Sequence, residues 1–262
     1  MANFTRFIAL GDSMTEGMCD DIVDGQYRGW ADRLADVLAE QTKGFSYFNL
    51  AIRGKLLHQV INDQIPIAKR YIEGPQTLVS FNAGANDVLR PNYKPEKAMA
   101  EYRAAVADLA ATGATLILYT AIEKVDGKGK AAELWHQRFS DFNVNVRAVA
   151  KEHGAYLAEA RRAPYLGDKR FLHTDRLHLN AEGHRRFAEG VKEVLGLPFD
   201  STWNLPLGPA PKKNFLVEKA INVKWIITFV IPWIWRRLRG KSSGDGRSAK
   251  HFAPVPWPSN QH

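Results

Sequence analysis

The sequence predicts a doubly wound α/β domain, in which helices pack on both faces of a parallel sheet. Several short apolar runs lack internal polar alternation, which is typical of strands buried on both faces. Longer segments with apolar residues at helical spacing separate these runs, as in parallel sheets with crossover helices. The chain has 262 residues, 45% of them hydrophobic, so one complete core and an extension are expected.

Five apolar runs are the expected strands, and five amphipathic runs are the expected helices. The strands are expected at residues 6–11, 45–54, 77–84, 114–121 and 155–160. The helices are expected at residues 29–41, 56–71, 95–112, 133–154 and 181–196. Pro95 at the start and Gly113 just after the end delimit the third of these helices. Ligands in such folds bind beyond the carboxyl ends of the strands, so side chains there are the first candidates for function.

The chain is expected to divide into four parts. The domain covers residues 4–198, and a linker follows at residues 199–218. Residues 219–240 are expected to form an apolar and basic helical segment. Residues 241–262 are rich in Ser, Gly and Pro, which predicts a disordered tail.

The net charge of +8 comes from the C-terminal extension alone. Residues 1–210 hold 26 basic and 26 acidic side chains, whereas residues 211–262 hold ten basic side chains against two acids. The single cysteine, Cys19, allows no internal disulfide, and the first residues lack the pattern of a signal peptide. A cytoplasmic location is therefore expected.

Ser13 follows the first predicted strand directly, in the segment Gly-Asp-Ser. Gly11 permits a tight turn there, and the amides of a helical turn that begins nearby would face whatever reacts with the serine. A hydroxyl needs a base to act as a nucleophile at neutral pH. Without such a base, the simpler interpretation is that Ser13 caps a helix.

Polar residues at other strand ends favour the nucleophile. Asp175 and His178, three residues apart in the last loop, can form the pair that orients a histidine base for Ser13. Ester cleavage also needs donors for the oxyanion. The backbone amides of Ser13 and Gly54 and the side-chain amide of Asn86 can supply three.

With these blocks in order, the sequence resembles the SGNH, or GDSL-type, hydrolase family. The blocks are Gly-Asp-Ser at Ser13, a glycine at Gly54, Gly-Ala-Asn-Asp around Asn86, and Asp-Arg-Leu-His from Asp175 to His178. The resemblance implies a flavodoxin-like, three-layer α/β/α fold with a central parallel sheet and metal-free ester hydrolysis. By position, it makes Ser13 the nucleophile, His178 the base and Asp175 its partner, with Ser13, Gly54 and Asn86 as the oxyanion hole.

Other polar residues have simpler interpretations. Asp12 and Asp87 are expected to brace turns, and His184 is expected on a solvated helix face. His173, together with Asp175 and His178, is an alternative metal site, but the serine arrangement already uses two of the three. No metal and no cofactor are expected.

The segment from Trp225 to Trp235 is apolar except for Thr228, and basic residues follow it. A helix of this length covers about half of a bilayer, so it is not expected to span one. Tryptophan beside arginine suits either an anionic membrane surface, through residues 219–241, or packing on the domain. Nucleic acid is not an expected partner, because no binding motif accompanies the charge.

The favoured function is a serine hydrolase that cleaves carboxylic esters through an acyl-enzyme intermediate. The substrate is a lipid ester, a small acyl ester or an acetylated sugar. Two alternatives stay open at this point. One is a membrane-associated binding module without turnover, and the other is an acyltransferase that uses the same triad.

Overall fold

The centre of the molecule is a six-stranded sheet. The computed structural model describes residues 3–123, 129–210, 214–239 and 241–258. The strands are β1 (Arg6–Gly11), β4 (Ser46–Asn49), β5 (Thr77–Asn82), β6 (Thr115–Tyr119), β7 (Tyr156–Ala158) and β8 (Val255–Pro256). Their order is β7-β6-β5-β1-β4-β8, and only the pairing of β8 with β4 is antiparallel among these six. The five parallel strands lie within the five predicted runs.

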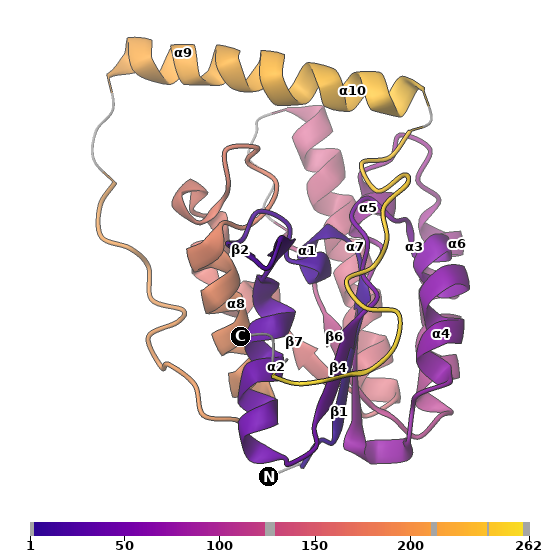
Figure 1. The fold of residues 1–262 in the computed structure, drawn as a ribbon. Helices are drawn as coiled ribbons and strands as arrows, with labels where there is room; N and C mark the ends of the chain where they lie inside the picture. Colours follow the sequence, from indigo (N-terminus) through magenta and orange to yellow (C-terminus); the bar gives the residue numbers. More distant parts are fainter. Residues whose placement is uncertain (1–2, 124–128, 211–213, 240, 259–262) are drawn as a thin grey trace.

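Helices cover both faces of this sheet (Figure 1). The α-helices are α1 (Ser13–Glu16), α2 (Gly29–Gln41), α3 (Leu57–Gln59), α4 (Ile65–Lys69), α5 (Ala85–Val88), α6 (Pro95–Ala110), α7 (Lys130–Glu152), α8 (Ala181–Val194), α9 (Phe215–Trp225) and α10 (Ile231–Leu238). Val60–Gln64 is a π-helical turn between α3 and α4, and Ile226–Val230 is another between α9 and α10. A two-stranded hairpin, β2 (Ile22–Val23) with β3 (Gln26–Tyr27), precedes α2. Short 3₁₀ helices are Gly74–Gln76, Ala160–Arg162, Pro164–Gly167 and Lys169–Phe171.

Alternate side chains of each central strand enter two separate apolar layers. Ile8 and Leu10 of β1 belong to the layer that includes residues of α6 and α7. Phe7 and Ala9 belong to the layer formed with α2 and α8. The predicted three-layer α/β/α architecture is therefore confirmed, and it places the carboxyl ends of the parallel strands at one edge of the sheet.

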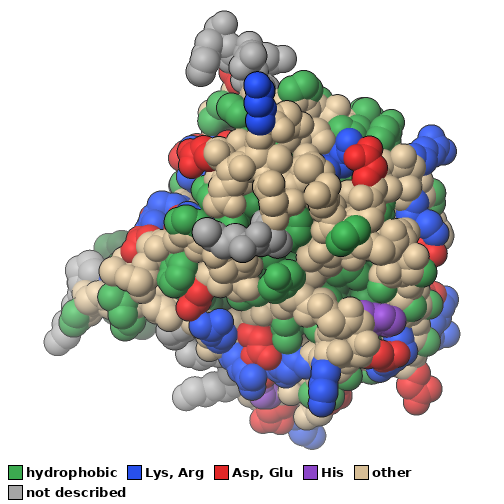
Figure 2. All heavy atoms as spheres, turned by 90° about the horizontal axis from the view of Figure 1, so that it is seen from below, with side chains coloured by type: hydrophobic (Ala, Val, Ile, Leu, Met, Phe, Trp, Pro, Cys, Tyr) green, Lys and Arg blue, Asp and Glu red, His purple; other side chains and the backbone are tan. Residues whose placement is uncertain are grey.

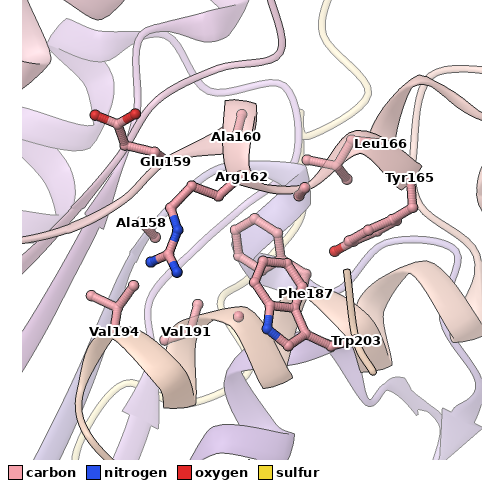
Figure 3. Close-up of a pocket in the computed structure, with 12 residues that line it drawn as sticks. Ala158, Glu159, Ala160, Arg162, Tyr165, Leu166, Phe187, Val191, Val194 and Trp203 are labelled. Atoms are coloured by element: carbon pink, nitrogen blue, oxygen red, sulfur yellow. The ribbon is translucent and has the colours of Figure 1, made fainter. Parts of the chain in front are cut away.

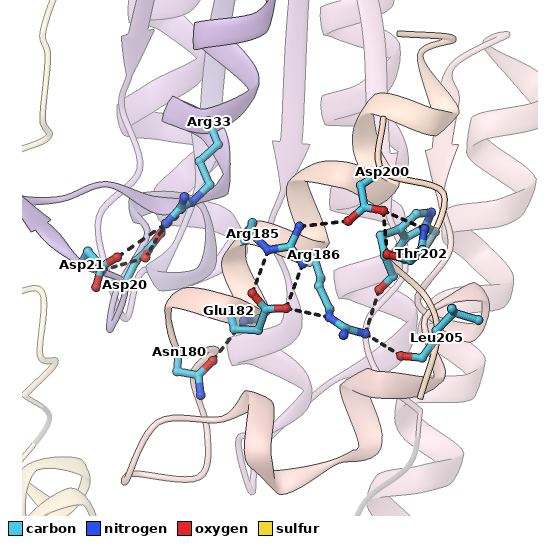
Figure 4. Close-up of polar contacts among 12 residues, drawn as sticks. Asp20, Asp21, Arg33, Asn180, Glu182, Arg185, Arg186, Asp200, Thr202 and Leu205 are labelled. Atoms are coloured by element: carbon cyan, nitrogen blue, oxygen red, sulfur yellow. Dashed lines mark hydrogen bonds and ion pairs between the residues drawn. The ribbon is translucent and has the colours of Figure 1, made fainter. Parts of the chain in front are cut away.

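Residues 199–205, expected as part of a linker, pack against α8 instead. Trp203 is buried, and its ring contacts Gly190 so closely that an added Cβ would lie 2.9 Å from it. Arg185 binds Asp200, while Arg186 donates to the carbonyls of Trp203 and Leu205 (Figure 4). One tryptophan is a weak signal in a polar and proline-containing segment, which is why the sequence pattern missed this packing.

The expected helical segment at residues 219–240 is helical, although the helix begins earlier, at Phe215. Helix α9, the π-helical turn and α10 follow one another without a break, across the edge where the strands end (Figure 1). None of the helix side chains that the structure describes is buried, and Ile227 and Trp235 are more than half exposed. Among the described residues, no helix is both long and apolar enough to cross a bilayer.

The expectation of a disordered tail at residues 241–262 is wrong for residues 241–258; the last four lie outside the described residues. After α10 the chain returns along the sheet and adds β8 to its edge (Figure 1). Lys250 binds Asp32 at 2.8 Å, and the Trp257 indole donates to Asp36 at 2.8 Å. Because these partners are more than 200 residues away in the chain, local composition could not indicate them.

On the face opposite the strand ends, basic and acidic side chains lie beside one another around the rim (Figure 2). This mixed surface agrees with the balanced charge of residues 1–210.

Candidate active site

Ser13 is the first residue of α1, directly after β1. The turn between them needs glycine, since a Cβ on Gly11 would lie 2.4 Å from the Asn82 carbonyl oxygen. Asp12, not Ser13, caps the helix, because its Oδ1 accepts from the Met14 N–H at 3.2 Å. The capping interpretation of Ser13 is therefore wrong, and its hydroxyl is turned towards another partner.

That partner is His178. Its Nε2 lies 3.0 Å from Ser13 Oγ, and its Nδ1 lies 2.7 Å from Asp175 Oδ2. The two contacts form one chain of hydrogen bonds that joins side chains 165 residues apart in the sequence. Residues from the first strand end and from the last loop thus meet at the same edge of the sheet, as predicted.

The Asp175 carboxylate is held from several directions. Its Oδ1 accepts from the N–H groups of Leu177, at 2.9 Å, and of His178, at 3.1 Å. Burial alone would raise the pKa of Asp175, but the hydrogen bond and charge of His178 and the two backbone donors outweigh it and lower the pKa to about 2. The carboxylate is therefore ionised at neutral pH and suited to stabilise a protonated His178.

Of the other predicted site residues, Gly54 lies on the loop after β4 and Asn86 lies in α5, after β5. Gly54 has a φ of +74°, which favours glycine. The Asn86 side-chain amide donates to Asp12 Oδ2 at 2.9 Å and to the Lys55 carbonyl at 3.1 Å. Both of its hydrogens are thus engaged, and the Lys55 bond joins Asn86 to the residue after Gly54.

Asp12 connects the serine turn to Asn86. Its carboxyl accepts from Asn86 and from the Met14 N–H, yet burial raises its pKa to about 6 despite these donors. The Asp12 carboxyl holds the Asn86 amide in its orientation. Because a buried carboxylate is costly to ionise, Asp12 also lowers the stability of the protein near neutral pH.

This arrangement has counterparts among known proteins. The model of the GDSL-like Lipase/Acylhydrolase family matches residues 9–186, which is more than half of the chain and contains all five predicted site residues. The chain belongs to this family. As a member, it is a carboxylic ester hydrolase. No curated protein matches the chain significantly.

Solved structures of other hydrolases share the fold of this GDSL-like hydrolase. The acetylxylan esterase Axe2 from Geobacillus stearothermophilus is 18% identical, with a TM-score of 0.61 over 77% of this chain and 100% of the other. LAE5, an alpha/beta hydrolase enzyme from the metagenome of Lake Arreo, is 21% identical, with a TM-score of 0.60 over 75% and 97%. The esterase EstA from Pseudoalteromonas sp. is 18% identical, with a TM-score of 0.56 over 73% and 97%. At these identities the likeness shows the fold.

Two supports of the site carried no signal in the sequence. Gln64 is buried in the π-helical turn before α4, where it donates to the Gly11 carbonyl at 2.9 Å and accepts from the Gly11 N–H at 2.8 Å. Glu16 accepts from the Arg53 N–H at 2.6 Å and forms an ion pair with its guanidinium. A glutamine in an amphipathic helix and a Glu–Arg pair 37 residues apart are both ordinary in sequence, so only the fold reveals what they hold.

Helix α9 also contacts the acid loop of this GDSL-like hydrolase. The Trp225 indole N–H donates to the backbone carbonyl of Asp175 at 2.8 Å. The Arg176 guanidinium lies over the Trp225 ring, 4.8 Å from its centroid. The extension therefore reaches the residue that orients the candidate base.

The residues that could bind a metal in the structure differ from those of the alternative metal site. Among the described residues, the candidate metal-ligand group is Cys19, His173 and Asp175, whose ligand atoms lie within 4.8 Å of one another. Its members differ from the predicted set, since Cys19 replaces His178. Burial and the nearby Asp175 carboxylate raise the pKa of Cys19 to about 12, which disfavours a thiolate ligand. A metal there would also compete with His178 for Asp175 Oδ2.

Two further expectations have opposite outcomes. Asp87 does brace a turn, because its Oδ2 accepts from the Leu57 N–H at 2.8 Å. The expectation of a solvated His184 is wrong, because this side chain is fully buried and its Nε2 lies 3.1 Å from the Met18 carbonyl. Burial lowers the pKa of His184 to about 4. Basic neighbours in the sequence did not indicate this burial, because a helix presents consecutive residues to different sides.

A separate pocket lies between the end of β7, α8 and Trp203 (Figure 3). Its walls include Ala158, Tyr165, Phe187 and Val191. None of the five predicted site residues lines this pocket, so it is not where the Ser13 hydroxyl meets a substrate.

Proposed function

We propose that the enzyme cleaves esters through an acyl-enzyme formed on Ser13. The observation that carries this proposal is the continuous contact from Ser13 Oγ to His178 Nε2, at 3.0 Å, and from His178 Nδ1 to Asp175 Oδ2, at 2.7 Å. Ser13 Oγ attacks the ester carbonyl while its proton passes to His178 Nε2. His178 gives that proton to the leaving alcohol, and then takes one from the water that attacks the acyl-enzyme. Asp175 keeps the ring oriented and stabilises its protonated form.

The oxyanion would be held by the N–H groups of Ser13 and Gly54 and by the Asn86 amide. Asn86 Nδ2 already has two acceptors, Asp12 and the Lys55 carbonyl. An oxyanion carries more charge than a carbonyl, so it replaces the Lys55 oxygen as the better acceptor. The bond to Asp12 stays and keeps the amide in place.

The experiment is ester hydrolysis by the purified full chain, with p-nitrophenyl acetate as the probe. We expect turnover by the wild type and none above background for Ser13→Ala. The matched control is Ser201→Ala, at an exposed serine outside the site. Equal turnover by Ser13→Ala and the wild type contradicts the proposal, whereas a wild type without turnover favours the binding module.

Hydrolysis and acyl transfer use the same groups and differ only in the acceptor. The proposal is hydrolysis, as in the family that the chain belongs to. Product analysis in the presence of an added alcohol separates the two. Free acid as the main product supports hydrolysis, whereas a new ester as the main product supports the acyltransferase.

The substrate class is a proposal of its own. Axe2, which shares the fold, is an acetylxylan esterase, and that favours small acyl groups such as those of acetylated sugars. The apolar helix beside the site favours lipid esters instead. A series of esters of increasing acyl length decides between them, because kcat/KM falls with length in the first case and rises in the second.

We also propose that the helix from Phe215 to Leu238 contacts an anionic membrane surface. Its exposed apolar side chains include Ile227, Ile231 and Trp235, and Lys219 and Lys224 lie on the same helix. Such a combination inserts rings and aliphatic groups at headgroup depth while the cations meet lipid charge. This helix would bring the site to a lipid surface.

Sedimentation with vesicles tests this contact. We expect binding to vesicles with phosphatidylserine and much less to pure phosphatidylcholine. The variant Ile231→Ser/Trp235→Ser should lose binding, whereas Ile22→Ser/Val144→Ser, at exposed positions elsewhere, should keep it. Equal binding by both double variants and the wild type contradicts the proposal.

A further inference from the structure

Residues 242–245 form a tight turn that lies against the loop carrying Gly54. The Ser242 N–H donates to Asp245 Oδ2 at 2.8 Å, and the Gly244 N–H donates to Ser242 Oγ at 3.2 Å. The Ser242 hydroxyl in turn donates to the Gly54 carbonyl at 3.2 Å. This turn lies outside the residues that the family model matches, so the contact is a feature of the extension.

The two backbones approach each other as closely as glycine allows. A Cβ on Gly54 would lie 2.2 Å from Ser242 Oγ. A Cβ on Gly244 would lie 2.0 Å from the Arg53 carbonyl oxygen. A side chain at Gly244 must therefore displace the turn or the loop, whereas one at Gly54 must displace the Ser242 hydroxyl.

This contact acts on the peptide group that carries the candidate oxyanion donor. The Arg53 carbonyl and the Gly54 N–H belong to one planar, trans peptide, in which the two groups point in opposite directions. Gly244 lies against the carbonyl side, so the Gly54 N–H is directed away from the turn. The next carbonyl, that of Gly54, is held by Ser242. The turn thus fixes the peptides on both sides of the Gly54 Cα.

The other side of the loop is held by α1. Glu16 accepts from the Arg53 N–H at 2.6 Å and lies three residues after Ser13 on the same short helix. The Gly54 loop is therefore held between the helix that bears Ser13 and the turn of the extension. Removing either support frees the orientation of the Gly54 N–H.

The turn is itself anchored to the domain. Ala249 is buried in the same apolar layer as Leu50. Lys250 binds the buried Asp32 at 2.8 Å, and Tyr47 pairs with Val255 in the sheet. Because these contacts hold the chain after the turn in place, the turn can hold the Gly54 loop.

We infer that Ser242 is a positioning residue for catalysis, and that the turn at residues 242–245 orients the Gly54 N–H for the oxyanion. The inference depends on the proposed function, in which Gly54 is an oxyanion donor. The extension is then part of the active site rather than an appendage to it.

The test compares Ser242→Ala with Ser248→Ala, at an exposed serine outside the turn, in the full chain. Steady-state hydrolysis of p-nitrophenyl acetate gives kcat and KM, reaction with a fluorophosphonate gives a rate for a tetrahedral adduct, and thermal unfolding gives Tm. For Ser242→Ala we expect kcat and the phosphonylation rate to fall together by about threefold to tenfold, as for one neutral hydrogen bond. KM and Tm stay near the wild-type values. Gly244→Ala, which forces the backbones apart, should lower kcat further.

Each outcome decides something. If Ser242→Ala has the same kcat as Ser248→Ala and the wild type, the inference is wrong while the proposed function stands. If Ser242→Ala lowers only Tm, or changes kcat and KM by equal factors, the turn has a structural role only. Either result also overturns the inference. If the wild type shows no hydrolysis that depends on Ser13, the proposed function is wrong, and the inference is wrong with it.

Discussion

Apolar side chains are buried in the domain but exposed on the helix that follows it. In the sheet layers, Val79 and Phe48 are fully buried, whereas Ile227 and Trp235 on the helix are 58% and 55% exposed. The strap after the helix, residues 241–258, is again anchored, through Lys250, Trp257 and β8. Burial of apolar surface therefore holds the domain. Polar contacts and strand pairing hold the strap, whereas the apolar side chains of the helix between them stay exposed.

The exposed apolar side chains of the helix therefore add little to the stability of the fold. The helix's described contacts with the acid loop are one hydrogen bond and one cation–π contact, both through Trp225. An exposed apolar stretch on a soluble surface is costly unless it meets a partner. Variants in the domain and in the helix separate effects on activity from effects on stability, and the largest effect is expected at Asp175.

Asp175→Asn should reduce kcat by about 10⁴-fold, because an amide neither stabilises a protonated His178 nor fixes the required tautomer. Steady-state kinetics on p-nitrophenyl acetate measure this. Asp168→Asn, in an ion pair with Arg170 near the surface, is the control and should keep its activity. Comparable rates for the two variants would remove Asp175 from the mechanism.

Asn86→Ala should lower kcat by about 10²–10³-fold while the protein stays folded, since it removes one oxyanion donor. The control is Asn92→Ala, at an exposed position of the following loop. Circular dichroism checks the fold. An Asn86→Ala enzyme that matches the control in rate contradicts its role as a donor.

Phe142→Ala should lower the free energy of unfolding by about 3–5 kcal/mol, because the ring fills a buried site against Gly84 and Tyr102. Trp235→Ala, at an exposed position of α10, should change it by less than about 0.5 kcal/mol. Chemical denaturation measures both. A large loss for Trp235→Ala would mean that the helix does support the fold.

Asp12→Asn should stabilise the protein at pH 8. Burial raises the pKa of Asp12 from 3.8 to about 6, so the contribution of this group to stability is present at acid pH and lost as the pH rises through about 6. Above that pH the buried carboxylate costs up to about 3 kcal/mol, which the neutral amide avoids. Thermal unfolding at pH 8 and at pH 4.5 should show a larger gain at pH 8. An equal gain in stability at both pH values would contradict the role of the buried Asp12 carboxylate.

The sequence predicted the layers and the contact of Asp175 with His178 because both depend on local patterns. Buried strands such as Arg6–Gly11 need continuous apolar runs, and the Asp175–His178 pair needs only a three-residue spacing. The strap could not be predicted, because its anchors pair residues such as Lys250 and Asp32 that are 218 positions apart. The same holds for Gln64, whose function in the turn depends on a strand end 53 residues before it.

The most direct test of the account is to map the site of reaction with a fluorophosphonate by mass spectrometry of the intact chain and its peptides. Covalent capture needs an activated hydroxyl, and the contact with His178 supplies the activation of Ser13. The account predicts one adduct, on the peptide that contains Ser13, and its loss in the His178→Ala variant. An adduct on another residue, or labelling of Ser13 that persists at the full rate without His178, would contradict it.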